Sequence, residues 1–134
     1  MNRQIFVNLP VNDLPKSMDF FDRLGFEFNP QFTDEHAACM VIGRESYVML
    51  LVEPFFATFT GKQVADATTQ TEAILCVSAG SRAEVDALVH TALAAGGQPA
   101  KDAQEDGPMY GWSFQDLDGH QWEVMHMDPS ALAR

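Results

Sequence analysis

The sequence has few cysteines and no long apolar run, and each shortage excludes a class of protein. Only Cys39 and Cys76 occur, both within apolar stretches. We expect two buried, reduced thiols in a cytoplasmic protein, with a single disulfide as the alternative. No apolar stretch approaches the roughly 20 residues of a membrane-spanning helix. The N-terminus lacks the pattern of a secretory signal, which also favours a cytoplasmic location.

Basic residues are scarce as well. Eight Lys and Arg stand against 19 Asp and Glu, which gives a formal net charge of −11. Because such a surface repels phosphate backbones and anionic lipids, we expect neither nucleic acid nor a membrane as a partner. A cationic small molecule would be attracted, although the charge also has a simpler interpretation as a source of solubility.

Several catalytic and nucleotide-binding motifs are missing. The chain has no phosphate-binding glycine loop, no nucleophile elbow and no Cys–His pair at a recognisable spacing. The composition is that of an ordinary folded protein, with 46% hydrophobic and 20% charged residues. The length of 134 residues is enough for one compact domain with a real core.

The first half of the chain predicts a strand, a helix and further strands. Residues 4–11 read as the first strand, and Asp13 is a suitable N-cap for a helix that Gly25 ends. The apolar pattern then predicts three strands, at residues 26–32, 37–43 and 46–53. Residues 54–70 read as a connection that starts with phenylalanines; residues 54–59 form either a mobile flap or part of a dimer interface.

The same order of elements follows in the second half. Residues 72–79 predict a strand, and Ser81 with Glu84 forms a capping box for a helix that ends at Gly96 and Gly97. Two further strands are predicted at 109–116 and 120–127, around a turn. The segments YVMLLVEP (47–54) and WEVMHMDP (122–129) correspond, which pairs Tyr47 with Trp122. The sequence therefore predicts a duplicated α+β domain, with one module at about 1–60 and another at about 70–134.

Two segments resemble a known superfamily. VNDLPKSMDFFDRLGFEF (11–28) and DLDGHQWEVM (116–125) are similar to the motifs of the glyoxalase, bleomycin-resistance and extradiol-dioxygenase proteins, also called vicinal oxygen chelate proteins. The resemblance implies a glyoxalase-like fold, in which two βαβββ modules form a half-open mixed-sheet barrel around a pocket. It also implies a small-molecule ligand and a homodimer.

Enzymes of this superfamily place four inward side chains around a divalent metal, from the first and last strands of each module. By the resemblance, these positions are Phe6, Val48, Glu72 and Glu123, with Met49 in place of Val48 if the register shifts by one residue. Phenylalanine and valine cannot ligate a metal. Glu72 and Glu123 could hold Zn, Ni, Mn or Fe together with substrate oxygens. Because two carboxylates without a histidine make a poor site for these metals, we expect that no metal is bound.

The alternation of side chains along the strands predicts which residues line the pocket. Glu123 is expected to point into it, with a role in catalysis or metal binding; the alternative is a carboxylate held by buried hydrogen bonds. For Glu72 the alternative is an exposed strand start. If both carboxylates share the pocket, one pKa should rise, which would suit acid–base chemistry. The other expected pocket residues are Phe6, Asn8, Val48, Leu50, Tyr110 and Gln121.

The four histidines show no metal-binding spacing. His120 reads as a turn residue rather than a ligand, and His36 and His90 read as surface residues. His126 is expected on the helix-facing side of its strand, in a structural role. For Trp112 and Phe114 we expect a place in the core.

Two functions remain open. One is an enzyme, a lyase, isomerase or oxidoreductase of the glyoxalase or dioxygenase type, which acts on a small oxygenated molecule with Glu123 as its catalytic residue. The other is a metal-free, bleomycin-resistance-like protein that sequesters a cationic small molecule. Phe6 and Val48 at metal positions favour the second.

Overall fold

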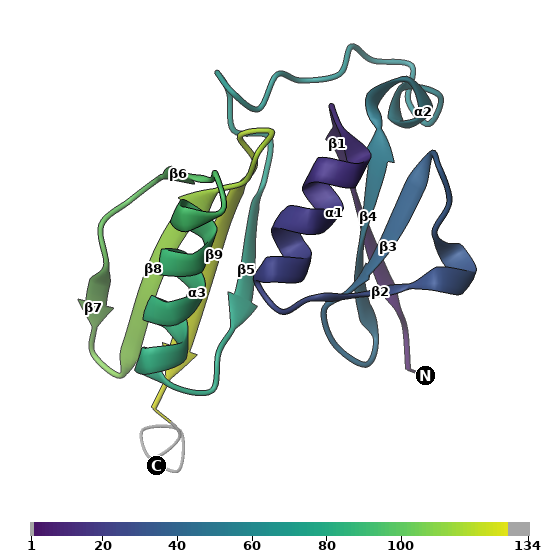
Figure 1. Cartoon of the computed structure of the whole chain (residues 1–134). Helices are drawn as coiled ribbons and strands as arrows, with labels where there is room; N and C mark the ends of the chain where they lie inside the picture. Colours follow the sequence, from purple (N-terminus) through teal and green to yellow (C-terminus); the bar gives the residue numbers. More distant parts are fainter. Residues whose placement is uncertain (1, 129–134) are drawn as a thin grey trace. The chain divides into compact units, whose positions relative to one another are not determined.

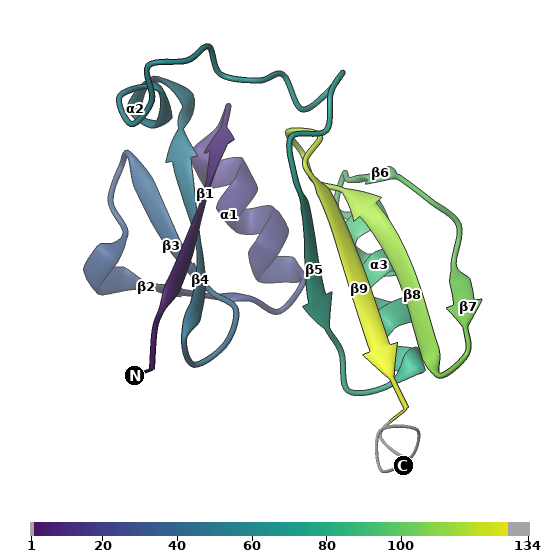
Figure 2. The same cartoon turned by 180° about the vertical axis from the view of Figure 1, so that it is seen from behind.

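The computed structural model describes residues 2–128, which form two compact units divided in sequence between Ala65 and Asp66. Each unit has a helix packed on one face of a mixed sheet (Figures 1 and 2). This confirms the predicted α+β class and its duplicated order of elements. No helix among residues 2–128 is long and apolar enough to cross a membrane.

Unit 1 is built on a four-stranded sheet with the order β1-β4-β3-β2. The first and last strands are parallel neighbours, and the other pairs are antiparallel. The segment predicted as a connection begins with a short helix instead. The elements are β1 (Ile5–Val11), α1 (Leu14–Arg23), β2 (Glu27–Asn29), the 3-10 helix η1 (Pro30–Phe32), β3 (Ala37–Val41), β4 (Ser46–Val52) and α2 (Glu53–Ala57).

Unit 2 repeats this topology with the order β5-β9-β8-β6, and β7 also pairs with β8. Its first and last strands are again parallel neighbours. The sequence did not predict β6 and β7, because they are very short and exposed and therefore have no apolar alternation. The elements are β5 (Ile74–Ser78), α3 (Arg82–Ala94), β6 (Gln98–Pro99), β7 (Gln104–Asp106), β8 (Met109–Gln115) and β9 (Gln121–Met127).

Both main helices begin at the predicted caps. The Asp13 carboxylate accepts a hydrogen bond from the Lys16 N–H, and the Ser81 hydroxyl accepts one from the Glu84 N–H. The Glu84 carboxylate reaches back to the N–H of Gly80, one residue before the cap residue that a standard capping box would use. Each cap satisfies donors that the first turn of a helix leaves unpaired.

The core of unit 2 lies between α3 and one face of the sheet. Trp122 and Val124 of β9 are fully buried there, together with Phe114 of β8 and Val85 of α3. The rings of Phe114 and Trp122 lie nearly parallel, with centroids 6.4 Å apart. Since neighbouring residues of a strand point to opposite faces, Glu123 projects from the face away from α3.

The two cysteines are both free, and only one of them is buried. Cys39 lies in the core of unit 1, as expected, but Cys76 is exposed on β5. The prediction of two buried thiols was therefore wrong for Cys76. Its strand lies at the edge of the sheet, and its apolar neighbours Leu75 and Val77 take the opposite face.

Candidate functional site

Unit 2 contains a cavity of about 440 Å³ on the sheet face that carries Glu123. Gln121, which was predicted to line a pocket, lies in the same wall. The exposed segment that includes β7 forms another part of it. The lining residues are Ile74, Cys76, Lys101, Asp102, Gln104, Asp106, Met109, Gly111, Trp112, Ser113, Gln121, Glu123, Val124 and Met125.

Glu123 stands between two polar neighbours on adjacent strands. It pairs with Cys76 of β5 on one side and with Ser113 of β8 on the other. The Ser113 hydroxyl is occupied, because it accepts a hydrogen bond from the Lys101 N–H at 2.9 Å. The partly buried carboxylate of Glu123 has no hydrogen bond or ion pair with any of residues 2–128. It is therefore available to a ligand.

The negative charge of Glu123 affects the pKa of the Cys76 thiol on the neighbouring strand. Burial raises the pKa of Cys76, and the negative charge of Glu123 raises it further. Both effects disfavour the thiolate, so Cys76 is a poor nucleophile near neutral pH.

Replacement of Glu123 by glutamine is therefore expected to lower the pKa of Cys76 and to speed its alkylation. The rate of reaction with iodoacetamide, measured by mass spectrometry across the alkaline pH range, should rise at lower pH in Glu123→Gln than in the parent. The exposed Glu45 offers a control, since Glu45→Gln should leave the profile unchanged. Identical profiles in all three proteins would show that Glu123 exerts no field on the thiol.

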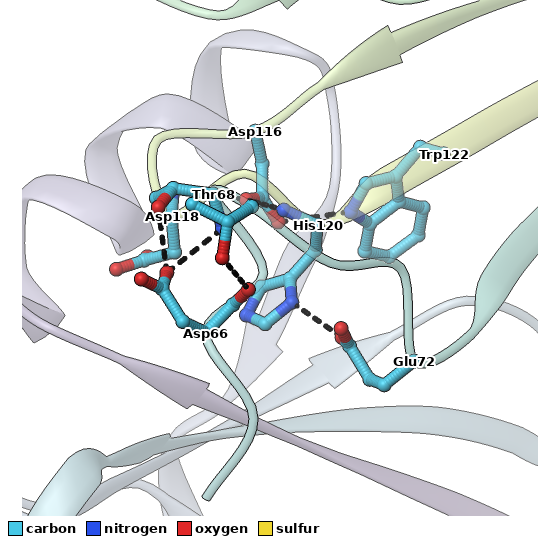
Figure 3. A network of polar contacts seen from close by, with 8 residues as sticks. Asp66, Thr68, Glu72, Asp116, Asp118, His120 and Trp122 are labelled. Atoms are coloured by element: carbon cyan, nitrogen blue, oxygen red, sulfur yellow. Dashed lines mark hydrogen bonds and ion pairs between the residues drawn. The ribbon is translucent and has the colours of Figure 1, made fainter.

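Glu72 does not line this cavity and therefore does not form the predicted pair with Glu123. Its carboxylate lies 2.9 Å from Nδ1 of His120, which is only 2% exposed (Figure 3). The prediction was wrong because it aligned the two halves two residues out of register. Phe6 lies seven residues before the N-cap Asp13, and the residue seven before the N-cap Ser81 is Ile74.

The DLDGH turn that precedes β9 is organised by Asp116. Its Oδ1 accepts hydrogen bonds from the N–H groups of Asp118 and His120, and its Oδ2 accepts one from the indole of Trp122 at 3.0 Å. Burial raises the pKa of Asp116, and the nearby His120 and these three donors act in the opposite direction. His120 is thus a structural turn residue, which ties the turn to Glu72.

Unit 1 has a cavity of its own, of about 520 Å³. The predicted residues Phe6 and Asn8 line it, and the ring of Phe6 stacks on that of Tyr47 with centroids 4.9 Å apart. The full set is Gln4, Phe6, Asn8, Asn29, Phe32, Cys39, Tyr47 and Met49.

Val48 and Leu50, in contrast, do not line this cavity. Their side chains are 3% and 0% exposed and belong to the core of unit 1. The prediction had equated Tyr47 with Trp122, but Tyr47 lines a cavity whereas Trp122 is buried in a core. The structure has the alternative register, shifted by one residue from the predicted alignment of the two halves, and in it Met49 lines the cavity.

Tyr110 is also absent from the cavity wall. Its hydroxyl donates a hydrogen bond to the Asp86 carboxylate on α3, and the Arg82 guanidinium lies 4.5 Å from the centre of its ring. The hydrogen bond to Asp86 raises the pKa of Tyr110. The residue therefore fastens β8 to α3, and the prediction of a ligand contact was wrong. Trp112 also faces α3, where its ring meets that of His90.

The comparisons with known proteins agree with this architecture. The family described as bleomycin resistance protein-like N-terminal matches residues 3–43. The structure of the hypothetical protein SA1046 from S. aureus has 30% sequence identity, with 94% of this chain and 95% of that chain covered and a TM-score of 0.79. A glyoxalase/bleomycin resistance protein/dioxygenase family enzyme from Burkholderia phytofirmans PsJN has 18% identity, coverage of 91% and 96%, and a TM-score of 0.76.

The chain belongs to the glyoxalase/bleomycin-resistance/dioxygenase superfamily. Its fold is also shared by TnmS3, an antibiotic binding protein from Streptomyces sp. CB03234, with 17% identity, coverage of 95% and 97%, and a TM-score of 0.63. A search of curated proteins finds no match. The superfamily thus includes proteins described as enzymes and proteins described as binders.

The metal positions of the superfamily can now be assigned with the observed register. Asn8 pairs with Met49 in unit 1, as Cys76 pairs with Glu123 in unit 2. The four positions therefore hold Phe6, Met49, Ile74 and Glu123. Only Glu123 is a good ligand for Zn, Ni, Mn or Fe, so these side chains do not fit a resident metal. No group of three potential metal ligands occurs within residues 2–128.

Proposed function

We propose that this protein binds a cationic small organic molecule in the cavity of unit 2 and sequesters it without a resident metal. The observation that carries the proposal is the unpaired Glu123 carboxylate in the cavity wall. A partly buried carboxylate without a partner gains most from a ligand that supplies a positive charge or a hydrogen-bond donor.

The rest of the cavity suits such a ligand. Its volume of about 440 Å³ lies within the range of pockets that hold drug-sized molecules. Ile74, Met109 and Met125 supply apolar surface, and Gln121 supplies a carboxamide. Among the charged lining residues, Asp102, Asp106 and Glu123 outnumber Lys101, so the local field favours a cation. The net charge of −11 acts in the same direction.

A catalytic role for Glu123 is the second candidate. A carboxylate with no partner can accept a proton from a bound carbonyl compound, which is the step that a lyase or isomerase of the glyoxalase type requires. The residues at the four metal positions do not favour a metal-assisted form of this reaction, because three of these residues are poor metal ligands. The homodimer and the cytoplasmic location stay predictions.

Metal-free bleomycin, a cationic antibiotic, is a suitable probe of the binding proposal. Calorimetric titration should give a saturable affinity that weakens as salt is added. Glu123→Gln should weaken binding by roughly three- to tenfold, as expected for the loss of one partly exposed ion pair. Glu45→Gln, which changes the net charge equally at an exposed turn, should bind like the parent.

Two results would contradict the proposal. One is an affinity that is the same in Glu123→Gln and the parent. The other is about one metal ion per purified chain, by elemental analysis, that is lost in Glu123→Ala, since this would establish a metal centre and favour the enzyme.

A further inference from the structure

We propose that Asp106 is a site of spontaneous covalent modification, at which the main chain rearranges to isoaspartate through a cyclic imide with Gly107. The sequence contains two Asp–Gly pairs, at residues 106–107 and 118–119. Such pairs are prone to this rearrangement, because glycine has no Cβ to shield its nitrogen or to restrict its backbone. The structure leaves the first pair free to react and holds the second in place. This inference goes beyond the proposed function, since the reaction needs no ligand.

The only co-reactant is water. The Gly107 nitrogen attacks Cγ of the Asp106 carboxyl group, a C–N bond forms, and the carboxyl hydroxyl leaves as water with the amide proton. A second water then opens the imide. Cleavage between the nitrogen and Cγ restores aspartate, whereas cleavage between the nitrogen and the main-chain carbonyl carbon leaves the chain connected through Cγ, as isoaspartate. No atom is oxidised or reduced in either step.

The first pair lies at an exposed hairpin end. Asp106 pairs with Met109, which leaves Gly107 and Pro108 as a two-residue turn between β7 and β8. Asp106 and Gly107 are both exposed, and the Gly107 N–H has no hydrogen bond with any of residues 2–128. β7 has three residues, all exposed, at the edge of its sheet (Figures 1 and 2). So short a pairing opens at little cost in free energy, which lets the carboxyl group reach the nitrogen.

The second pair is held inside the DLDGH turn. The Gly119 N–H donates a hydrogen bond to the main-chain oxygen of Asp116 at 3.1 Å, and the Asp118 N–H donates one to Oδ1 of Asp116. Gly119 also lies so close to the loop at Ala67 that an added Cβ would be 2.7 Å from the carbonyl oxygen there. Attack by this nitrogen requires the loss of its hydrogen bond and a movement of the turn. We therefore expect the reaction at Asp118 to be much slower than at Asp106.

Isoaspartate at position 106 would alter one wall of the unit 2 cavity. The rearrangement adds a methylene group to the main chain between positions 106 and 107. Because a two-residue turn fixes the register of a hairpin, the longer chain cannot keep both the turn and the pairing of Asp106 with Met109. Gln104 and Asp106 line the cavity, so two of its side chains would be displaced.

Incubation of the folded protein in water labelled with heavy oxygen tests the proposal. Each passage through the imide leaves one heavy oxygen in the protein, whichever bond opens. Chymotrypsin cleaves at the aromatic residues between the two pairs, so mass spectrometry of the peptides measures the label at each pair separately. In the folded protein, Asp106 should gain label at least about tenfold faster than Asp118. In urea, where the turn and the hairpin are lost, the two rates should agree within about threefold.

Two variants serve as controls. Asp106→Glu keeps the charge but would have to form a larger ring, and it should gain label at this position roughly tenfold more slowly or less. Gly107→Ala shields the nitrogen with a Cβ and should slow the reaction by a similar factor. Both changes lie at exposed positions, so both variants should fold, which circular dichroism checks. The label at Asp118 should be the same in both variants and the parent.

Three results would overturn the proposal. One is equal labelling of Asp106 and Asp118 in the folded protein. Another is labelling at position 106 that is as fast in Asp106→Glu as in the parent. The third is a labelled peptide that contains aspartate alone, since isoaspartate should be present as a second peptide of the same mass with a different chromatographic retention.

Discussion

Replacement of Gly119 by alanine is expected to lower the free energy of unfolding by about 3 kcal/mol or more. The residue has a φ of +88°, where a side chain costs roughly 1–2 kcal/mol. An added Cβ would also lie 2.7 Å from the carbonyl oxygen of Ala67. Because this contact is with backbone, no rotamer change can relieve it, and the loop at Ala67 must move.

Two other glycines separate the cost of a positive φ from the cost of the close contact with backbone. Gly25 has a similar φ of +97° and Gly107 a φ of +60°, but neither has an atom within 4 Å of an added Cβ. Each alanine variant at these positions should therefore cost only about 1 kcal/mol. Urea denaturation, followed by circular dichroism, measures all three. A cost for Gly119→Ala no larger than that for Gly25→Ala would show that the close approach to Ala67 does not constrain the turn.

Replacement of Asp116 by alanine should cost a similar amount, about 3 kcal/mol. The carboxylate accepts hydrogen bonds from two backbone N–H groups and from the indole of Trp122, and it is only 3% exposed. Each buried donor left without an acceptor costs about 1–3 kcal/mol. Water that enters the site and the relief of a buried charge will offset part of the sum.

The contribution of the indole can be isolated. Asp116→Asn retains Oδ1 for the two backbone donors but turns an amino group towards the indole N–H. A double-mutant cycle with Trp122→Phe should give a coupling energy of about 1–2 kcal/mol between the two sites. Asp19→Ala, which removes an exposed pair with Arg23, is the control and should change stability by less than about 0.5 kcal/mol. Additivity of Asp116→Asn and Trp122→Phe would contradict the proposed role of Oδ2.

Asp116 and Gly119 explain why the DLDGH segment identifies a fold but not a reaction. Asp116 holds the turn together, Gly119 permits the loop at Ala67 to approach, and His120 is occupied by Glu72. Further along β9, Gln121 and Glu123 line the cavity, and Glu123 presents a carboxylate that has no partner among residues 2–128. The most recognisable residues of the segment therefore hold the turn together, and the proposed ligand contact belongs to Glu123, a less distinctive neighbour.

The sequence by itself determined the two main helices and the long strands of this protein, but not the short elements η1, α2, β6 and β7. The caps at Asp13 and Ser81 and the alternating apolar residues of the long strands are local signals, and the structure follows them. The inward direction of Glu123 follows from its position between Trp122 and Val124, since alternation along a strand needs no knowledge of its partners. The similarity of the two halves was also visible as an order of elements.

Only the tertiary structure decided which residues share a wall. Val48 and Met49 are both apolar, so composition cannot choose the face of β4 that each one takes, and a shift by one residue exchanges core and cavity. Glu72 and Tyr110 were assigned to a pocket but are bound by His120 and Asp86, which lie 48 and 24 residues away. Such partners are set by the pairing of strands and the packing of a helix across long stretches of chain, and no local pattern records them.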